Sequence, residues 1–72
     1  MIDVATALPA IGVVVFVQER IGDTPHFDFA TWDGKKWWPV DIESGGVNVE
    51  RHLTVIAWEP APWAEQKWGK VL

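Results

Sequence analysis

The segment GVVVFVQER, residues 12 to 20, constrains the fold more than any other part of the chain. Its β-branched residues are typical of a strand, and the segment is too short for an independent helix. Successive side chains of a strand point to opposite faces, so Val15 and Val17 share one face while Val14 and Phe16 share the other. Because both faces are apolar, this strand needs a packed layer on each side.

The length and the missing cysteines limit how those layers can be held together. A chain of 72 residues is close to the size below which folding needs a disulfide, a metal or a partner. It contains no cysteine, which excludes disulfides, thiolate metal sites and cysteine nucleophiles. The stability of the fold must therefore come largely from burying aliphatic residues, six tryptophans and three phenylalanines. The first prediction from the many tryptophans is a compact core.

The segment HFDFATW, residues 26 to 32, predicts the second strand, and Asp33-Gly34 predicts a hairpin turn of type I′ after it. A three-residue loop with a bulge at Gly34 would shift the pairing by one residue, and the sequence leaves both registers open. The type I′ register distributes the aromatic residues as Phe27, Phe29, Trp38 and Val40 on one face, with Trp32 and Trp37 on the other.

The segment VDIESGGVNVE, residues 40 to 50, predicts a second hairpin around Ser44-Gly45-Gly46, with apolar and polar residues in alternation. In this hairpin Asp41 would face Glu50 as a like-charge pair. The half-buried face of this hairpin would consist of Val40, Ile42, Val47 and Val49.

The segment LTVIAWEP, residues 53 to 60, predicts a last strand that is apolar on both faces. The tail after it predicts about two helical turns, with Pro62 at the first helical position and Gly69 as the stop. We therefore expect a single domain, 1–72, with a lead over 1–11, a β meander over 12–59 and a tail or short helix over 60–72. The predicted fold is all-β or mainly β: four or five antiparallel strands in a meander, as a rolled sheet or small open barrel, with a short C-terminal helix.

Composition argues against several classes of function. The formal charge of −4 argues against nucleic-acid binding, which depends on clustered Lys and Arg. The apolar start of the chain is interrupted at Gly12 and Gln18 and has no basic flank, so neither a membrane span nor a signal peptide is predicted, and a cytoplasmic location is expected. No glycine-rich phosphate loop is present, and no cofactor is predicted.

Residues that could support catalysis or bind a metal are few. Ser44, His52 and a carboxylate could be written as a triad, but no nucleophile-elbow pattern surrounds the serine, and we predict a protein that is not an enzyme. His26 with Asp28, and Glu50 with His52, have a same-face spacing compatible with metal ligands on neighbouring strands. Such alternations are common on protein surfaces, so no metal site is predicted.

The tryptophans that the core does not need are the candidates for binding. A binding platform could be formed by Trp32 and Trp37, together with a lysine beside the predicted turn. The two tail tryptophans either complete the second layer or lie in an exposed apolar patch. We expect the chain to bind a protein partner or to self-associate. The alternatives are a small carbohydrate-binding or base-stacking module and a homodimer with a structural role. The predicted binding residues are Trp32, Lys36, Trp37, Trp63 and Trp68.

Three motifs, LPAIGVVVFV, ATWDGKKWW and VIAWEPAP, together resemble a family of small uncharacterised phage and prophage proteins, a domain of unknown function. The matching positions are Leu8, Pro9, Gly12, Val15 and Val17; Asp33, Gly34 and Trp37 or Trp38; and Trp58, Pro60 and Pro62. The likeness covers residues 7 to 62. It implies an accessory protein in a bacterial cytoplasm that acts by binding, and inhibiting, a host or defence component.

Overall fold

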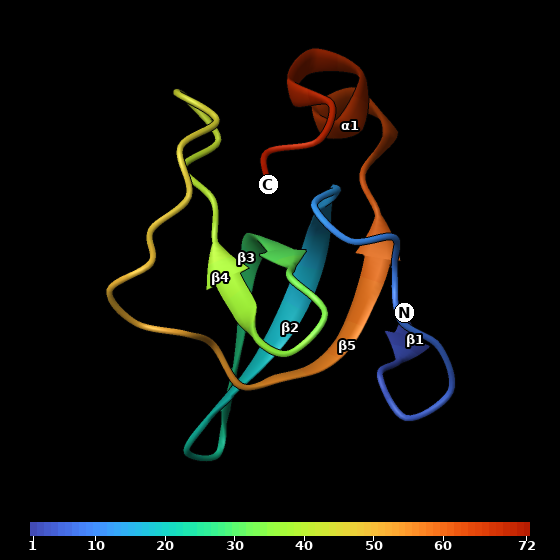
Figure 1. The fold of residues 1–72 in the computed structure, drawn as a ribbon. Coiled ribbons are helices and arrows are strands. Elements are labelled where there is room, and N and C mark those ends of the chain that lie inside the picture. The colour runs from blue at the N-terminus through green and yellow to red at the C-terminus, as the bar shows by residue number, and fades with distance from the viewer.

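Strand β2 (Val14–Ile21) lies at the centre of a single five-stranded antiparallel sheet, which confirms the predicted, mainly β fold. The structure is a computed structural model that describes residues 1–72 (Figure 1). The strand order is β1-β5-β2-β3-β4. The other elements are β1 (Ile2–Asp3), β3 (Thr24–Trp32), β4 (Trp37–Pro39), β5 (Val55–Pro60) and helix α1 (Pro62–Trp68).

Strands β2, β3 and β4 follow one another as a meander, whereas β5 returns along the other side of β2. The long loop before β5, yellow to orange in Figure 1, makes this return. Strand β1, which the sequence left inside the lead, adds two residues to the outer edge of β5 through the pair Ile2 and Trp58. A strand of two residues carries no periodic pattern that a sequence could reveal.

The sheet curls so that its β4 edge approaches the start of β5. Leu53, two residues before β5, forms a bridge with Trp37, and its amide donates to the Trp37 carbonyl at 2.8 Å. The curled sheet encloses one apolar cluster, which we call the inner core. Its buried residues are Val15, Val17, Ala30, Trp37, Val55 and Trp58.

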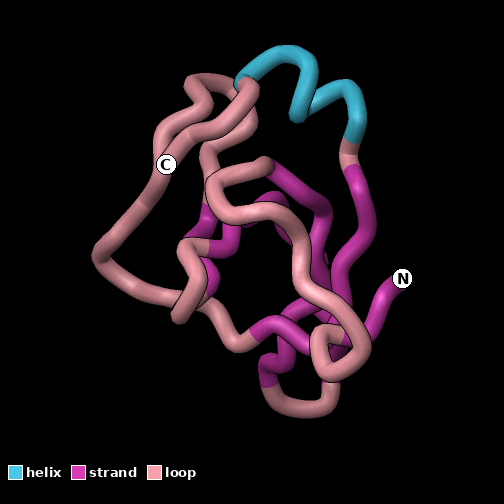
Figure 2. The backbone as a smooth tube through the Cα atoms, turned by 45° about the vertical axis from the view of Figure 1, so that its right-hand side comes forward, coloured by secondary structure: helices cyan, strands magenta, loops and turns pink.

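A second cluster, the outer core, lies on the opposite face of the sheet under α1. It consists of Val14, Val40, Ala61 and Ala64, with partly buried Phe16, Phe29, Ile42, Val47, Trp68 and Val71 around them. Both faces of β2 are thus covered, as its two apolar faces require. Figure 2 shows that α1 follows directly from the end of β5, and that the chain then turns back towards the loops, where Val71 donates its amide to the Gly12 carbonyl at 2.8 Å.

Helix α1 begins and ends where the sequence predicts. Pro62 occupies the first turn, and Gly69 ends the helix at a φ of 61°, donating its amide to the Glu65 carbonyl. Ala61 precedes the helix, and its side chain makes no capping hydrogen bond. The residue is instead buried in the outer core, which holds the start of the helix against the sheet. No helix in the chain is long and apolar enough to cross a membrane.

Both predicted registers of the first hairpin are wrong. Trp32 pairs with Trp37 and Thr31 with Trp38, so the loop contains four residues, 33 to 36. The Asp33 carboxylate explains this loop, because one oxygen accepts the amides of Lys35 and Lys36, each at 2.6 Å. Together with the bond from the Asp33 amide to the Lys36 carbonyl at 3.1 Å, these bonds favour a loop with Gly34 and Lys35 at its tip over a tight turn with Asp33 at its tip.

The other Asp33 oxygen accepts the indole N–H of Trp38 at 2.7 Å. This bond and the two loop amides hold the pKa of Asp33 down at about 2. The register differs from the type I′ prediction by two residues, and a shift of two restores every side chain to its face. Trp38 therefore lies on the Phe29 face, and Trp32 and Trp37 lie on the other, as predicted.

The second predicted hairpin is reduced to one bridge, between Val40 and Val47, in a register that differs from the predicted one, although Val40, Ile42 and Val47 lie in the outer core as expected. The Asp41 amide donates to the Gly46 carbonyl at 2.8 Å, and the Asp41 carboxylate accepts the Glu43 amide at 2.9 Å, which closes a compact turn. The predicted like-charge pair of Asp41 with Glu50 does not form, and Val49, expected on the buried face, is 65% exposed. Local bonds from an Asp side chain compete with strand pairing in this segment.

Trp68 packs its ring directly on the backbone of Gly45 in this turn. Gly45 has a φ of 73°, and a Cβ there would overlap the Trp68 ring. The tryptophan thereby attaches the loop after β4 to the outer core.

We expect Gly45→Ala to lower the free energy of unfolding by about 2–4 kcal/mol, because it adds both an unfavourable backbone conformation and an overlap with Trp68. Gly22→Ala is the matched control, since Gly22 also has a positive φ, of 57°, but nothing lies within 4 Å of its added Cβ. That control should lose only about 1–2 kcal/mol. Urea denaturation of both variants measures the difference, and equal losses would contradict the packing described for Trp68.

Candidate functional site

The predicted platform at the first hairpin is largely inside the protein. Trp37 is 5% exposed and packs in the inner core, and Trp32 lies against it with ring centroids 5.4 Å apart. Lys36 is exposed in the loop between them. The structure thus brings Trp32 and Trp37 together, but it offers little of Trp37 to a ligand.

The two tail tryptophans have different environments. Trp68 is half-buried in the outer core, with the Lys67 ammonium 4.8 Å from its ring centroid and its indole N–H buried without a hydrogen-bond partner. Trp63 is 54% exposed. Of the predicted binding tryptophans, Trp63 alone combines a large exposed area with contacts to other aromatic rings.

Those rings form what we call the aromatic strip: Phe27, Phe16, Phe29 and Trp63, in spatial order. Phe27 and Phe16 are stacked with centroids 5.8 Å apart and planes 8° apart. Phe16 and Phe29 are 5.3 Å apart, and Trp63 meets Phe29 edge-on, also at 5.3 Å. Contacts at these spacings are favourable aromatic geometries, so the four rings support one another as a continuous surface.

The pairing of β2 with β3 builds this strip. Phe16 lies directly opposite Phe29, and Gln18 lies opposite Phe27, so the three phenylalanines share the outer face of the two strands. The outer core covers Phe16 and Phe29 only in part, and Phe27 beyond them is 54% exposed. Sequence reasoning identified Trp63 but assigned Phe27 and Phe29 to the core, because alternation shows which face a residue occupies and not how far the covering layer extends.

Beside the strip lies a cavity of about 330 Å³, which we call the aromatic groove. It runs between the phenylalanines and the segment that joins β5 to α1. Glu59, opposite Phe16 in the register of β2 and β5, brings the one charged side chain of the lining. The lining residues are Phe16, Phe29, Glu59, Pro60, Ala61, Pro62 and Trp63.

The neighbouring edge of β3 is poorly suited to receiving another strand. Strand β4 pairs only with Ala30–Trp32, which leaves the first part of β3 without a partner on that side. In this part Pro25 has no N–H to donate, and the Phe29 amide donates to the Asp28 carboxylate at 2.8 Å. A proline and an occupied donor disfavour strand addition at these two positions of the edge.

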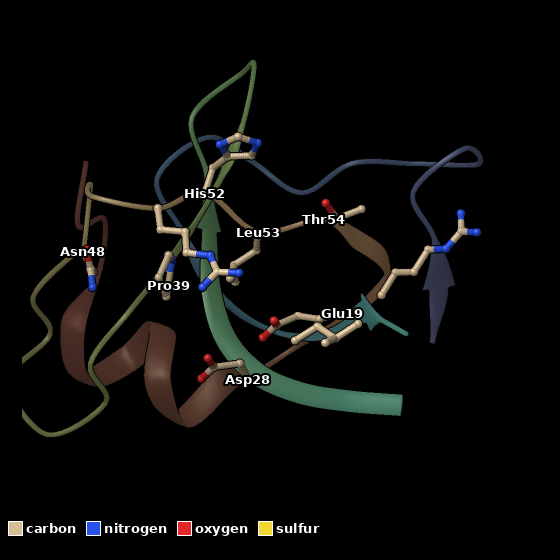
Figure 3. A pocket seen from close by; sticks show the side chains of 10 residues that line it. Glu19, Asp28, Pro39, Asn48, His52, Leu53 and Thr54 are labelled. Atoms are coloured by element: carbon tan, nitrogen blue, oxygen red, sulfur yellow. The ribbon is translucent and has the colours of Figure 1, made fainter. Parts of the chain in front are cut away.

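A second, polar cleft of about 310 Å³ opens at the end of the inner face (Figure 3). Glu19 and Asp28 enter it from β2 and β3, and Figure 3 shows their carboxyl groups near each other, with His52 farther away. The cleft is lined by Glu19, Arg20, Ile21, Asp28, Pro39, Asn48, Arg51, His52, Leu53 and Thr54.

Glu19 is 8% exposed on the same face as the inner core. Burial raises the pKa of its carboxyl group above 4.5, and the negative charge of Asp28 adds to this effect, while His26 and Arg51 oppose it. A side-chain hydrogen bond with Asp28 also contributes to the raised pKa of Glu19.

The four residues considered as metal ligands are not brought together as a set. Asp28 and His52 both line the polar cleft, whereas His26 and Glu50 do not. No group of three or more His, Cys, Asp or Glu side chains in the chain has a geometry that could hold a metal ion. His52 instead packs edge-on against Trp38, with ring centroids 6.1 Å apart.

Comparisons with protein-family models, with curated proteins and with solved structures find no match to this chain. The aromatic strip and the polar cleft are therefore the two features of the structure that bear on function. The resemblance to phage and prophage proteins stays a prediction from the three sequence motifs.

We expect Glu19→Gln to remove a pH-dependent loss of stability. Because the pKa of Glu19 is higher in the folded state than the usual 4.5, its contribution to stability is complete below about pH 4.5 and is lost as the pH rises through the folded pKa. The stability of the Glu19→Gln variant relative to the wild type should therefore increase between about pH 4 and about pH 7.

Urea denaturation at both pH values measures this effect, with the exposed Glu43→Gln as the matched control that should change little. A Glu19→Gln variant whose relative stability is independent of pH, or falls towards neutral pH, would contradict the environment described for Glu19.

Proposed function

We propose that the chain is a small, non-enzymatic protein-binding module that contacts its partner through the aromatic strip. The observation that carries this proposal is the exposure of the two ends of the strip, since Phe27 and Trp63 are each 54% exposed while their rings belong to one continuous set of contacts. Rigid aromatic side chains that are already held in place contribute disproportionately to protein interfaces, because little conformational entropy is lost on binding.

The polar side chains favour binding over catalysis. The Ser44 hydroxyl accepts the Gly46 amide at 3.1 Å within the turn after β4, which gives this lone serine a structural role. His52 packs on Trp38. Neither has the partner that a nucleophile or a general base requires.

The expected partner is a protein of the bacterial cytoplasm, and the resemblance to phage and prophage proteins makes inhibition of a host or defence component the proposed outcome of binding. The alternative of a carbohydrate-binding or base-stacking platform depended on Trp32 and Trp37. Since Trp37 is 5% exposed, no observation favours that alternative.

Capture from a bacterial lysate tests the proposal, with the wild type, Trp63→Ala, Phe27→Ala and, as a matched control, Leu8→Ala. Leu8 is 47% exposed and lies outside the strip. A captured protein is then purified and titrated against each variant. We expect both strip variants to weaken binding at least about tenfold and Leu8→Ala to leave it unchanged.

Circular dichroism establishes that each variant is folded before it is compared. A partner that binds the wild type and both folded strip variants equally would contradict the proposed contact surface, as would a partner whose binding depends on Leu8 alone.

A further inference from the structure

The spacing of the rings around the aromatic groove suits an extended proline-rich segment. Phe29 lies between Phe16 and Trp63, with centroid distances of 5.3 Å to each. The three rings in contact therefore extend over no more than these two steps, a length on the order of one polyproline II turn of about 9 Å. A ligand in this conformation, laid across the three rings, can place its proline side chains against them.

The rigidity of the groove favours the same kind of ligand. Pro60 and Pro62 fix the backbone of one wall, and Ala61 between them is buried in the outer core. A polyproline II segment is itself ordered before it binds, so both sides of this contact lose little conformational entropy.

The charge of the groove adds a second requirement. Glu59 is exposed and is the one charged residue among those that line the groove. The whole chain carries a formal charge of −4, which favours the approach of a cationic segment. A basic residue beside the prolines of the ligand could pair with the Glu59 carboxylate.

The area available argues against a second copy of the chain as the occupant. The exposed parts of the four rings amount to about 200–400 Å², given the roughly 150–250 Å² that each aromatic side chain can bury. A stable protein interface needs about 800 Å² from each partner. The strip and the groove are therefore large enough for a short peptide segment, and too small to hold a dimer on their own.

We propose that the aromatic groove binds a proline-containing, extended segment of a partner protein, with a basic residue of that segment paired to Glu59. This inference rests on the proposed function of the aromatic strip as a protein-binding surface. The strip supplies the apolar contact, the groove selects the extended conformation, and Glu59 selects the charge of the ligand.

Titration with synthetic peptides tests this proposal, and the perturbation of amide and indole NMR signals of the folded protein measures binding. Three short peptides are compared: one with proline at every third position and a flanking Arg, one with Glu in place of Arg, and one with alanine in place of every proline. We expect the proline peptide with Arg to bind most tightly and to perturb Phe16, Phe29 and Trp63. The alanine peptide should bind at least about tenfold more weakly.

Two variants isolate the role of charge. Glu59→Gln should weaken the Arg peptide by about twofold to fivefold, as expected for an exposed ion pair. Glu59→Lys should reverse the preference, so that the Glu peptide becomes the tighter ligand. Glu65→Gln, an exposed position in α1 outside the groove lining, is the matched control that should leave both peptides unchanged.

Equal binding of the proline and alanine peptides, an unchanged charge preference in Glu59→Lys, or perturbations confined to residues outside the groove would overturn the inference. If no peptide binds but a purified partner still depends on Trp63, this inference falls and the proposed function stands. If neither a peptide nor a Trp63-dependent partner binds, both fall.

Discussion

The two apolar faces of β2 have to be buried at the same time, and the arrangement of the rest of the chain depends on this constraint. Val17 is buried where the sheet curls around the inner core, and Val14 is buried under α1. Curling requires β5 to pair on the other side of β2, and the outer layer requires the tail to fold back across the sheet. A chain of this size has no further element with which to cover apolar surface.

The limited size of the outer layer explains the aromatic strip. Helix α1 spans only Pro62–Trp68, and with the turn near Gly45 it covers the part of the outer face around Val14 and Val40. The same face continues to Phe27, beyond this cover. The proposed binding surface is thus the continuation of the outer core, and its rings are held in place by the packing that stabilises the fold.

Sequence patterns predicted the features that depend on local chemistry. The β-branched run predicted β2, Pro62 and Gly69 predicted the limits of α1, and alternation placed Trp37 and Trp38 on opposite faces. The register of the first hairpin was not predictable, because it depends on which donors reach the Asp33 carboxylate once the chain is folded. The strip was missed for a related reason. Alternation assigns a residue to a face, but the extent of the layer above that face is set by contacts between segments distant in the sequence.

Solvent access to the six tryptophans tests the central claim most directly, namely that the outer layer leaves Trp63 exposed while the inner core is closed. With fluorinated tryptophan incorporated into the protein, each indole can give its own ¹⁹F NMR signal, and a soluble paramagnetic agent broadens the signals of exposed rings. We expect strong broadening for Trp63 and almost none for Trp37 and Trp58. A protected Trp63, or a Trp37 as accessible as Trp63, would contradict this claim.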